Sequence, residues 1–122
     1  MKYRPLGKTG LQVSEIGFGC GNTGGVLTGG TPEEQRRTVH RPLELGINFF
    51  DTAPNYGERT GGTGMSEVNL GRVLHEIGAR PIICTKVEFW PSELDDIPGK
   101  VRRRLAHRNG TGRPHHRRGK DG

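Results

Sequence analysis

The chain contains no hydrophobic run that approaches the roughly 18 residues of a membrane-spanning helix. Its N-terminus lacks the apolar segment of a secretory signal peptide. Only two cysteines are present, Cys20 and Cys84, which are too few for the disulfide framework of a small secreted domain. We therefore expect neither a membrane span nor secretion, and these absences favour a cytoplasmic protein whose thiols stay reduced.

Side chains that could fill a hydrophobic core are also scarce. Hydrophobic residues make up 30% of the 122 residues and aromatic residues 6%, whereas 21 positions are glycine. Because glycine has no side chain to bury, this composition predicts a thin core. The length allows one domain at most.

The net charge of +6 comes from one end of the chain. Residues 102–122 carry a charge of +7, whereas the 101 residues before them carry −1. A small basic protein that binds nucleic acid or an anionic surface through this segment is therefore the alternative function. The segment lacks the interleaved aromatic residues on which bases stack. Its pattern is more typical of a solvated, disordered tail, and nucleic-acid binding is not expected.

Hydrophobic patterning predicts short strands that alternate with helices. Strands are predicted in a hairpin, Tyr3–Leu6 and Leu11–Val13, and then singly at Glu15–Phe18, Ile47–Asp51 and Ile82–Val87. The segment Gly19–Gly30 is so rich in glycine that it predicts a loop.

The first helix has a clear start signal. Thr31 suits the N-cap, Pro32 the first helical position, and Glu34 completes a capping box. The helix is predicted to run to about Leu45. Pro42 predicts a kink or an early end just before it, because proline removes one backbone hydrogen bond from a helix.

Two further helices complete an alternating pattern. One is predicted between an N-cap at Ser66 and a terminating Gly78, and the other over Asp95–Leu105. Short apolar strands that alternate with helices are typical of parallel βαβ units, so the fold class is α/β. Three such strands do not close a barrel, and the sheet is expected to be open.

Three polar residues fall at the predicted strand ends or just after them. Asp51 ends the second of the single strands, Tyr56 lies in the loop after it, and Lys86 lies near the end of the third. Parallel strands bring such residues to one rim of the sheet. An ammonium group beside a phenol favours the phenolate, so the phenol can give its proton to a carbonyl oxygen, while a carboxylate holds the ammonium in place. Singly, each residue is more often structural; together they predict a catalytic site.

The same residues lie in segments that resemble one enzyme family. Residues 46–57 read GINFFDTAPNYG, residues 66–71 read SEVNLG, and residues 85–87 read TKV. Together with the opening YRPLGKTGLQVS at residues 3–14, they resemble the aldo-keto reductases over about residues 1–101.

This resemblance implies a (β/α)8 TIM barrel that reduces aldehydes or ketones with NADPH. It implies that Tyr56 is the proton donor and that Asp51 and Lys86 tune it. It also implies that Gly21, Asn22 and Asp51 lie against the nicotinamide end of the cofactor. No metal is implied, and the only expected partner is a small carbonyl substrate.

The length does not match the family. A complete barrel needs about 250 residues, so residues 1–101 are expected to form only the hairpin and the first three βα units. The family's fourth-strand histidine and its phosphate-binding loops have no counterpart here. From Arg104 on, Arg, Gly, His and Pro dominate, a composition typical of GC-rich coding DNA translated in a wrong frame, so our hypothesis is a frameshift near Arg102–Arg104. We expect a truncated, inactive NADP-dependent oxidoreductase followed by a basic, disordered tail. A half-barrel that pairs with a second chain is a further alternative.

Overall fold

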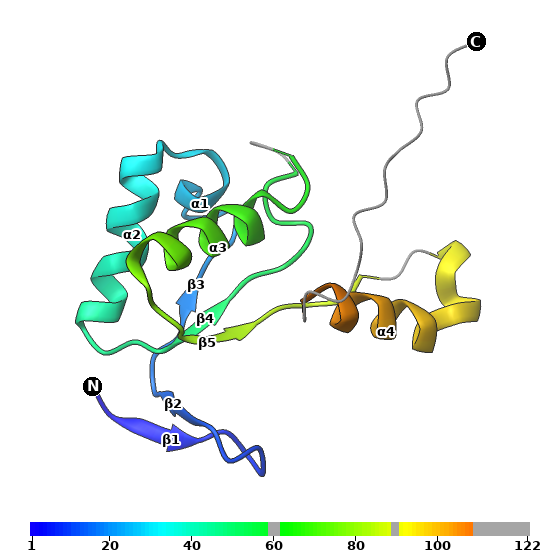
Figure 1. The fold of residues 1–122 in the computed structure, drawn as a ribbon, viewed down its shortest axis with the longest axis horizontal. Helices are drawn as coiled ribbons and strands as arrows, with labels where there is room; N and C mark the ends of the chain where they lie inside the picture. Colours follow the sequence, from blue (N-terminus) through cyan, green and yellow to red (C-terminus); the bar gives the residue numbers. More distant parts are fainter. Residues whose placement is uncertain (59–61, 89–90, 109–122) are drawn as a thin grey trace. The chain divides into compact units, whose positions relative to one another are not determined.

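A computed structural model describes residues 1–58, 62–88 and 91–108 (Figure 1). The chain divides into two compact units, Met1–Lys86 and Val87–Gly122. The first unit contains the predicted strands and the candidate site, and each unit is described by itself below.

The first unit opens with the predicted hairpin. β1 (Tyr3–Pro5) and β2 (Gln12–Ser14) pair antiparallel, with Arg4 opposite Val13. Asn48 joins the hairpin to the main sheet: its side-chain oxygen accepts from the Ser14 backbone N–H at 2.7 Å, and its side-chain amide donates to the Gln12 carbonyl at 2.9 Å. Since Asn48 directly precedes a strand of that sheet, the hairpin is tied to the amino ends of the strands.

The main sheet has three parallel strands in the order β3-β4-β5. They are β3 (Phe18–Gly19), β4 (Phe49–Asp51) and β5 (Ile82–Cys84). The predicted α/β class, with a hairpin and an open parallel sheet, is confirmed. Each strand is shorter than predicted, and the prediction of a strand over Glu15–Phe18 is wrong except at Phe18. The hydrogen bonds that define a strand form only where a neighbouring strand lies beside it. The hydrophobic pattern of a segment does not reveal where its neighbour begins and ends.

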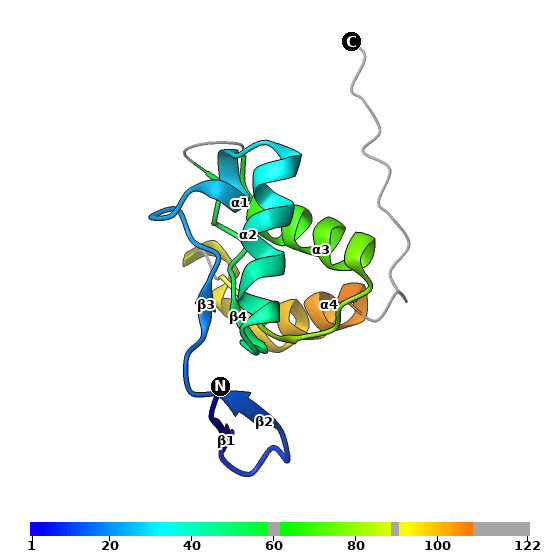
Figure 2. The same cartoon turned by 90° about the vertical axis from the view of Figure 1, so that its left-hand side faces the viewer.

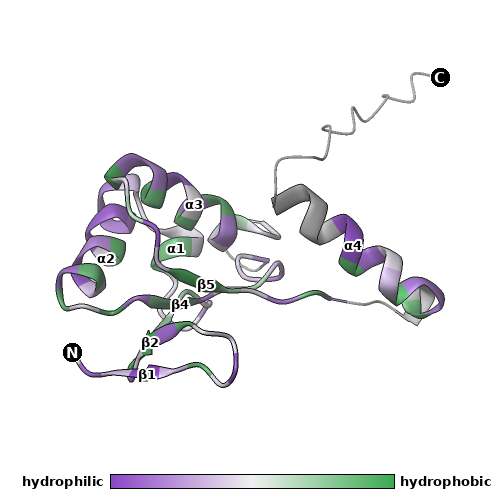
Figure 3. Cartoon of the chain, turned by 60° about the horizontal axis from the view of Figure 1, so that its bottom comes forward, coloured by the Kyte–Doolittle hydropathy of each residue, from purple (hydrophilic) through white to green (hydrophobic). Residues whose placement is uncertain are grey.

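Three helices lie on one side of this sheet (Figures 1 and 2). They are α1 (Val26–Gly29), α2 (Pro32–Glu44) and α3 (Met65–Ile77). The core between the helices and the sheet is small, and its buried hydrophobic members are Cys20, Leu27, Val39, Phe50, Leu70 and Val73. Figure 3 colours the chain by hydropathy and shows hydrophobic colour on β5 and hydrophilic colour over much of α2.

The start of α2 is as predicted, and so is its end near Leu45, which is the C-cap; the early end predicted from Pro42 does not occur. The Thr31 side chain accepts from the Glu34 backbone N–H at 3.3 Å, and the Glu34 carboxylate accepts from the Thr31 N–H at 2.8 Å, which completes the capping box. The helix continues through the buried Pro42 to Glu44, so the prediction of an early end is wrong. Proline this close to the C-terminus of a helix removes a single hydrogen bond, and the rest of the last turn still forms.

Two local predictions are wrong because glycine residues, Gly25 and Gly64, are the N-caps of helices. The loop predicted over Gly19–Gly30 contains the short helix α1, whose N-cap is Gly25. The helix α3 begins after Gly64 rather than after a cap at Ser66. Gly64 has φ 84°, in the left-handed region that favours glycine. Ser66 is therefore the second residue of α3, and its side chain is fully buried.

The second unit contains a 3-10 helix, Pro91–Asp96, followed by α4 (Ile97–Arg108). The predicted helix start at Asp95 falls inside the 3-10 helix. Arg103 forms an ion pair of 3.0 Å with Asp96. α4 continues past residue 102, the predicted start of the basic tail, and residues 109–122 lie outside the described residues.

Candidate active site

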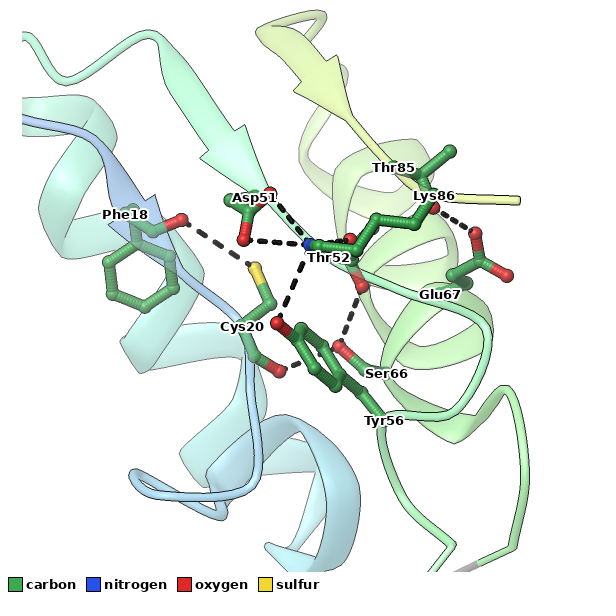
Figure 4. A network of polar contacts seen from close by, with 9 residues as sticks. All are labelled: Phe18, Cys20, Asp51, Thr52, Tyr56, Ser66, Glu67, Thr85 and Lys86. Carbon is green, nitrogen blue, oxygen red and sulfur yellow. Dashed lines mark hydrogen bonds and ion pairs between the residues drawn. The ribbon is translucent and has the colours of Figure 1, made fainter. Parts of the chain in front are cut away.

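The three predicted catalytic residues meet at the carboxyl ends of the strands (Figure 4). Asp51 is the last residue of β4, and Lys86 follows the end of β5 by two residues. Tyr56 lies in the loop that leads from β4 to α3. This placement agrees with parallel pairing, because Asp51 stands opposite Cys84 in the register of β4 and β5.

The ammonium group of Lys86 is the centre of the cluster. Its Nζ atom donates to Asp51 at 2.9 Å from Oδ1 and 3.0 Å from Oδ2, to the Thr52 carbonyl at 2.8 Å, and to the Tyr56 hydroxyl at 3.4 Å. It also lies 5.0 Å from the centre of the Tyr56 ring. Since Lys86 donates to the phenolic oxygen, the proton of the Tyr56 hydroxyl is left to point elsewhere.

These contacts keep Lys86 charged. Burial lowers the pKa of Lys86, but hydrogen bonds and charge from Asp51 and Tyr56 outweigh it, so the pKa lies above the ordinary value of 10.5. The side chains of Lys86 and Asp51 are 46% and 39% exposed. Tyr56 is half-buried, so a ligand at this rim can reach both the ammonium and the phenol from solvent.

The two other predicted cofactor-binding residues lie beside Tyr56. A Cβ atom on Gly21 would be 3.5 Å from the Tyr56 ring, so the backbone of Gly21 lies against that ring. The side-chain oxygen of Asn22 accepts from the Gly57 N–H at 2.9 Å. Asn22 thus holds the loop that carries Tyr56, and its exposed amide NH2 makes no hydrogen bond within the described part of the chain.

The turn after Tyr56 depends on glycine. Gly57 has φ 110°, and a Cβ atom there would overlap the carbonyl oxygen of Gly62 and the side chain of Met65. Any other residue at this position would push the loop away from α3 and displace Tyr56.

Two buried hydroxyl groups beneath the cluster were not predicted from the sequence. Thr52 and Ser66 lie 3.0 Å apart, and Ser66 Oγ donates to the Cys20 carbonyl at 2.8 Å. The available signals were the position of Thr52 directly after Asp51 and the place of the two hydroxyl residues in the segments 46–57 and 66–71 that carry the family resemblance. Nearby, Thr85 donates to Glu67 at 2.6 Å and connects the end of β5 to α3.

Cys20 is a third buried group at the site. It is 2% exposed, and Figure 4 shows its sulfur close to Asp51. Burial, with a smaller contribution from the charge of Asp51 and against the opposing charge of Lys86, raises the pKa of Cys20 from 9.0 to about 12. Cys20 is therefore a protonated, unreactive thiol at neutral pH.

Folding is expected to protect Cys20 from alkylation. In a Cys84→Ser variant, iodoacetamide at about pH 8 should label Cys20 orders of magnitude more slowly in the folded chain than in urea, because burial raises the pKa of the thiol and removes its reactive thiolate. At pH values above 9.0, the thiol of Cys20 loses its proton in the unfolded chain but keeps it in the folded chain. The free energy of unfolding should therefore fall as the pH rises past 9.0. Equal labelling rates would contradict this burial.

Other kinds of site are not found among the described residues. No group of three His, Cys, Asp or Glu side chains in residues 1–58, 62–88 and 91–108 could hold a metal ion. None of the helices in these ranges is long and apolar enough to cross a membrane.

Comparison with known proteins agrees with the site. Residues 15–111 match the model of the Aldo/keto reductase family. The chain is 36% identical to L-galactose dehydrogenase of Arabidopsis thaliana over 108 residues, which cover 86% of this chain and 32% of that protein. It is 38% identical over 89 residues to Aldo-keto reductase YhdN of Bacillus subtilis, covering 70% and 25% of the two chains. It is 40% identical over 93 residues to 6-dehydroglucose reductase of Novosphingobium aromaticivorans, covering 73% and 30%.

The matches cover only part of each relative, as expected for a chain whose sheet is open rather than closed into a barrel. The chain spans about a quarter to a third of the length of these relatives. The family match ends at residue 111, ten residues beyond the predicted limit of the resemblance. The chain corresponds to an N-terminal portion of the proteins in this family. The hairpin, the parallel strands and the match to the family model together show that the chain belongs to the aldo/keto reductase family.

Proposed function

We propose that Asp51, Tyr56 and Lys86 are part of an active site that reduces an aldehyde or ketone with NADPH. The observation that carries this proposal is the placement of the Lys86 ammonium between the Asp51 carboxylate and the Tyr56 hydroxyl. A phenol next to a fixed cation, with its proton free to point outward, is suited to give that proton to a carbonyl oxygen.

Each of the three side chains has a distinct part in this reaction. The Tyr56 hydroxyl donates a proton to the substrate oxygen as that oxygen gains negative charge. Lys86 stabilises the phenolate that this transfer leaves on Tyr56. Asp51 holds Lys86 through both carboxylate oxygens. NADPH, when bound, supplies the hydride that reduces the carbonyl carbon.

The residues at the rim fit the nicotinamide end of such a cofactor. The exposed amide of Asn22 can pair with a carboxamide, and Gly21 leaves the face of the Tyr56 ring free of a side chain. The phosphates of NADPH need cations or backbone N–H groups. Lys86 is the only cation hydrogen-bonded to the rim residues among the described residues, and it is already paired with Asp51. The phosphate-binding part of the site is therefore assigned to the rest of the barrel.

This chain alone is proposed to be inactive, because the residues that the structure describes form three of the eight strands of the barrel. We further propose a cytoplasmic location, since both cysteines are free.

The test compares the chain with a completed barrel. In a chimera, residues 1–86 of this chain would replace the matching part of the Bacillus subtilis relative. Both proteins would be mixed with NADPH and a panel of aldehydes and ketones, and NADPH absorbance would be followed. We expect carbonyl-dependent oxidation with the chimera and none with the chain alone. A folded chimera without activity would refute the proposed function, and turnover by the chain alone would refute its inactivity.

A further inference from the structure

A pair of buried hydroxyl groups lies directly beneath the three candidate catalytic residues. Ser66 is fully buried and Thr52 is 2% exposed. Ser66 Oγ donates its one proton to the Cys20 carbonyl at 2.8 Å, so in the 3.0 Å contact with Thr52 it is the acceptor and Thr52 the donor. Both hydroxyl groups are thus used within a closed network.

Ser66 contacts two of the segments that form the site, the loop after β3 and the segment after β4, and it is linked to the third, Lys86, through Thr52. Its hydroxyl contacts Cys20 in the loop after β3 and Thr52 at the end of β4. Its backbone N–H donates to the Tyr56 carbonyl at 3.2 Å. Figure 4 shows Ser66 on α3 between Cys20, Thr52 and Tyr56.

Each of these contacts leads to a group of the site. Thr52 presents its carbonyl oxygen to Lys86 Nζ at 2.8 Å, the shortest contact that this ammonium makes. Cys20 precedes Gly21, which lies against the Tyr56 ring. Movement of Ser66 would therefore change the position of the Lys86 ammonium relative to the Tyr56 hydroxyl.

We propose that Ser66, acting through Thr52, is a positioning residue for the proposed reduction. It sets the distance between the Lys86 ammonium and the Tyr56 hydroxyl without contacting substrate or cofactor. This inference rests on the proposed function, but its geometric part is tested without turnover. The separation of 3.4 Å between Lys86 Nζ and the Tyr56 hydroxyl is the quantity that it controls.

The experiment measures the Lys86 side chain by NMR in the full chain. Lysine Nζ and Cε signals would be recorded through a pH titration, and the Lys86 signal would be assigned with a Lys86→Arg variant. The titratable groups that face this ammonium are Asp51, Tyr56 and Cys20. All three are present in every variant compared, so a change in the titration reports a change in their distances from Lys86.

Two variants remove the network and two serve as matched controls. Ser66→Ala and Thr52→Val each remove one hydroxyl of the pair. Ser14→Ala and Thr28→Val remove buried hydroxyl groups of the same kind that bond away from the site, to the carbonyls of Ile16 and Gly25. Controls and test variants therefore each lose one buried hydroxyl group, and only the test variants lose contacts to the site.

We expect Ser66→Ala and Thr52→Val to shift the Lys86 titration downward and to speed the exchange of its ammonium protons with water. Neither control should change either quantity. If Ser66→Ala prevents folding, the nearly isosteric Thr52→Val still provides the test. An unchanged Lys86 titration in the folded test variants, or an equal change in the controls, would overturn the proposal.

The chimera separates this inference from the proposed function. There, Thr52→Val should lower kcat and leave KM for NADPH unchanged, whereas Thr28→Val should change neither. A Lys86 shift in the chain combined with an inactive chimera would mean that the network positions Lys86 but that the reduction is not its function. A Lys86 shift with an unchanged kcat in an active Thr52→Val chimera would overturn the role in the reaction alone.

Discussion

Replacement of Tyr56 by phenylalanine in the chimera is expected to lower kcat by about 10²–10⁴-fold, the usual contribution of a positioned general acid. The substitution removes only the hydroxyl oxygen that accepts from Lys86 at 3.4 Å. The phenyl ring can still lie against Gly21, so the loop and the cofactor side of the site are preserved. KM for NADPH should therefore change little. Initial rates with and without a saturating carbonyl substrate would measure both constants.

The chain contains a matched control for this substitution. Tyr3, the other tyrosine, donates its hydroxyl to the Gly46 carbonyl at 2.7 Å. That bond lies with the hairpin, at the amino ends of the strands, so Tyr3→Phe should leave kcat unchanged in a folded chimera. A loss of less than tenfold in Tyr56→Phe, or an equal loss in Tyr3→Phe, would show that Tyr56 is not the proton donor.

The residues that meet at the rim could be placed from the sequence because strand ends are a strong constraint. Asp51 and Lys86 lie at or just after the ends of two apolar segments that a helix separates in the sequence. Parallel pairing brings the ends of two such strands together whatever the strand lengths. The observed strands are only two or three residues long, yet the contact between Asp51 and Lys86 forms as expected. The errors in the predicted strand bounds therefore did not affect the prediction that Asp51 and Lys86 lie close together.

The details that could not be predicted depend on contacts between segments. Gly25 and Gly64 begin helices, whereas their neighbours in sequence suggested a loop and a serine cap. The role of Ser66 depends on Cys20, which is 46 residues away in the chain. Nothing local distinguishes a serine that caps a helix from one buried two residues inside it, because both favour the first turn.

Phe50→Ala is expected to cause the largest loss of stability in the first unit. Phe50 lies in the central strand β4 and is completely buried. Its ring centre lies 5.1 Å from that of Phe18, at an interplanar angle of 50°. Replacement of a buried phenylalanine by alanine costs about 3–5 kcal/mol, whereas the free energy of unfolding of most domains is about 5–15 kcal/mol. With so small a core, the variant should lose most of its helical circular dichroism at room temperature.

The neighbouring Phe49 provides the control, because successive side chains of a strand point to opposite faces of the sheet. Phe49 is only partly buried and does not belong to the core between sheet and helices. Phe49→Ala should leave the chain folded and lower its urea midpoint by less than Phe50→Ala does. Because both variants remove the same ring from the same strand, the difference measures the packing of β4 against α2 and α3. An equal loss in the two variants would mean that the helical face of this open sheet is not what holds the first unit together.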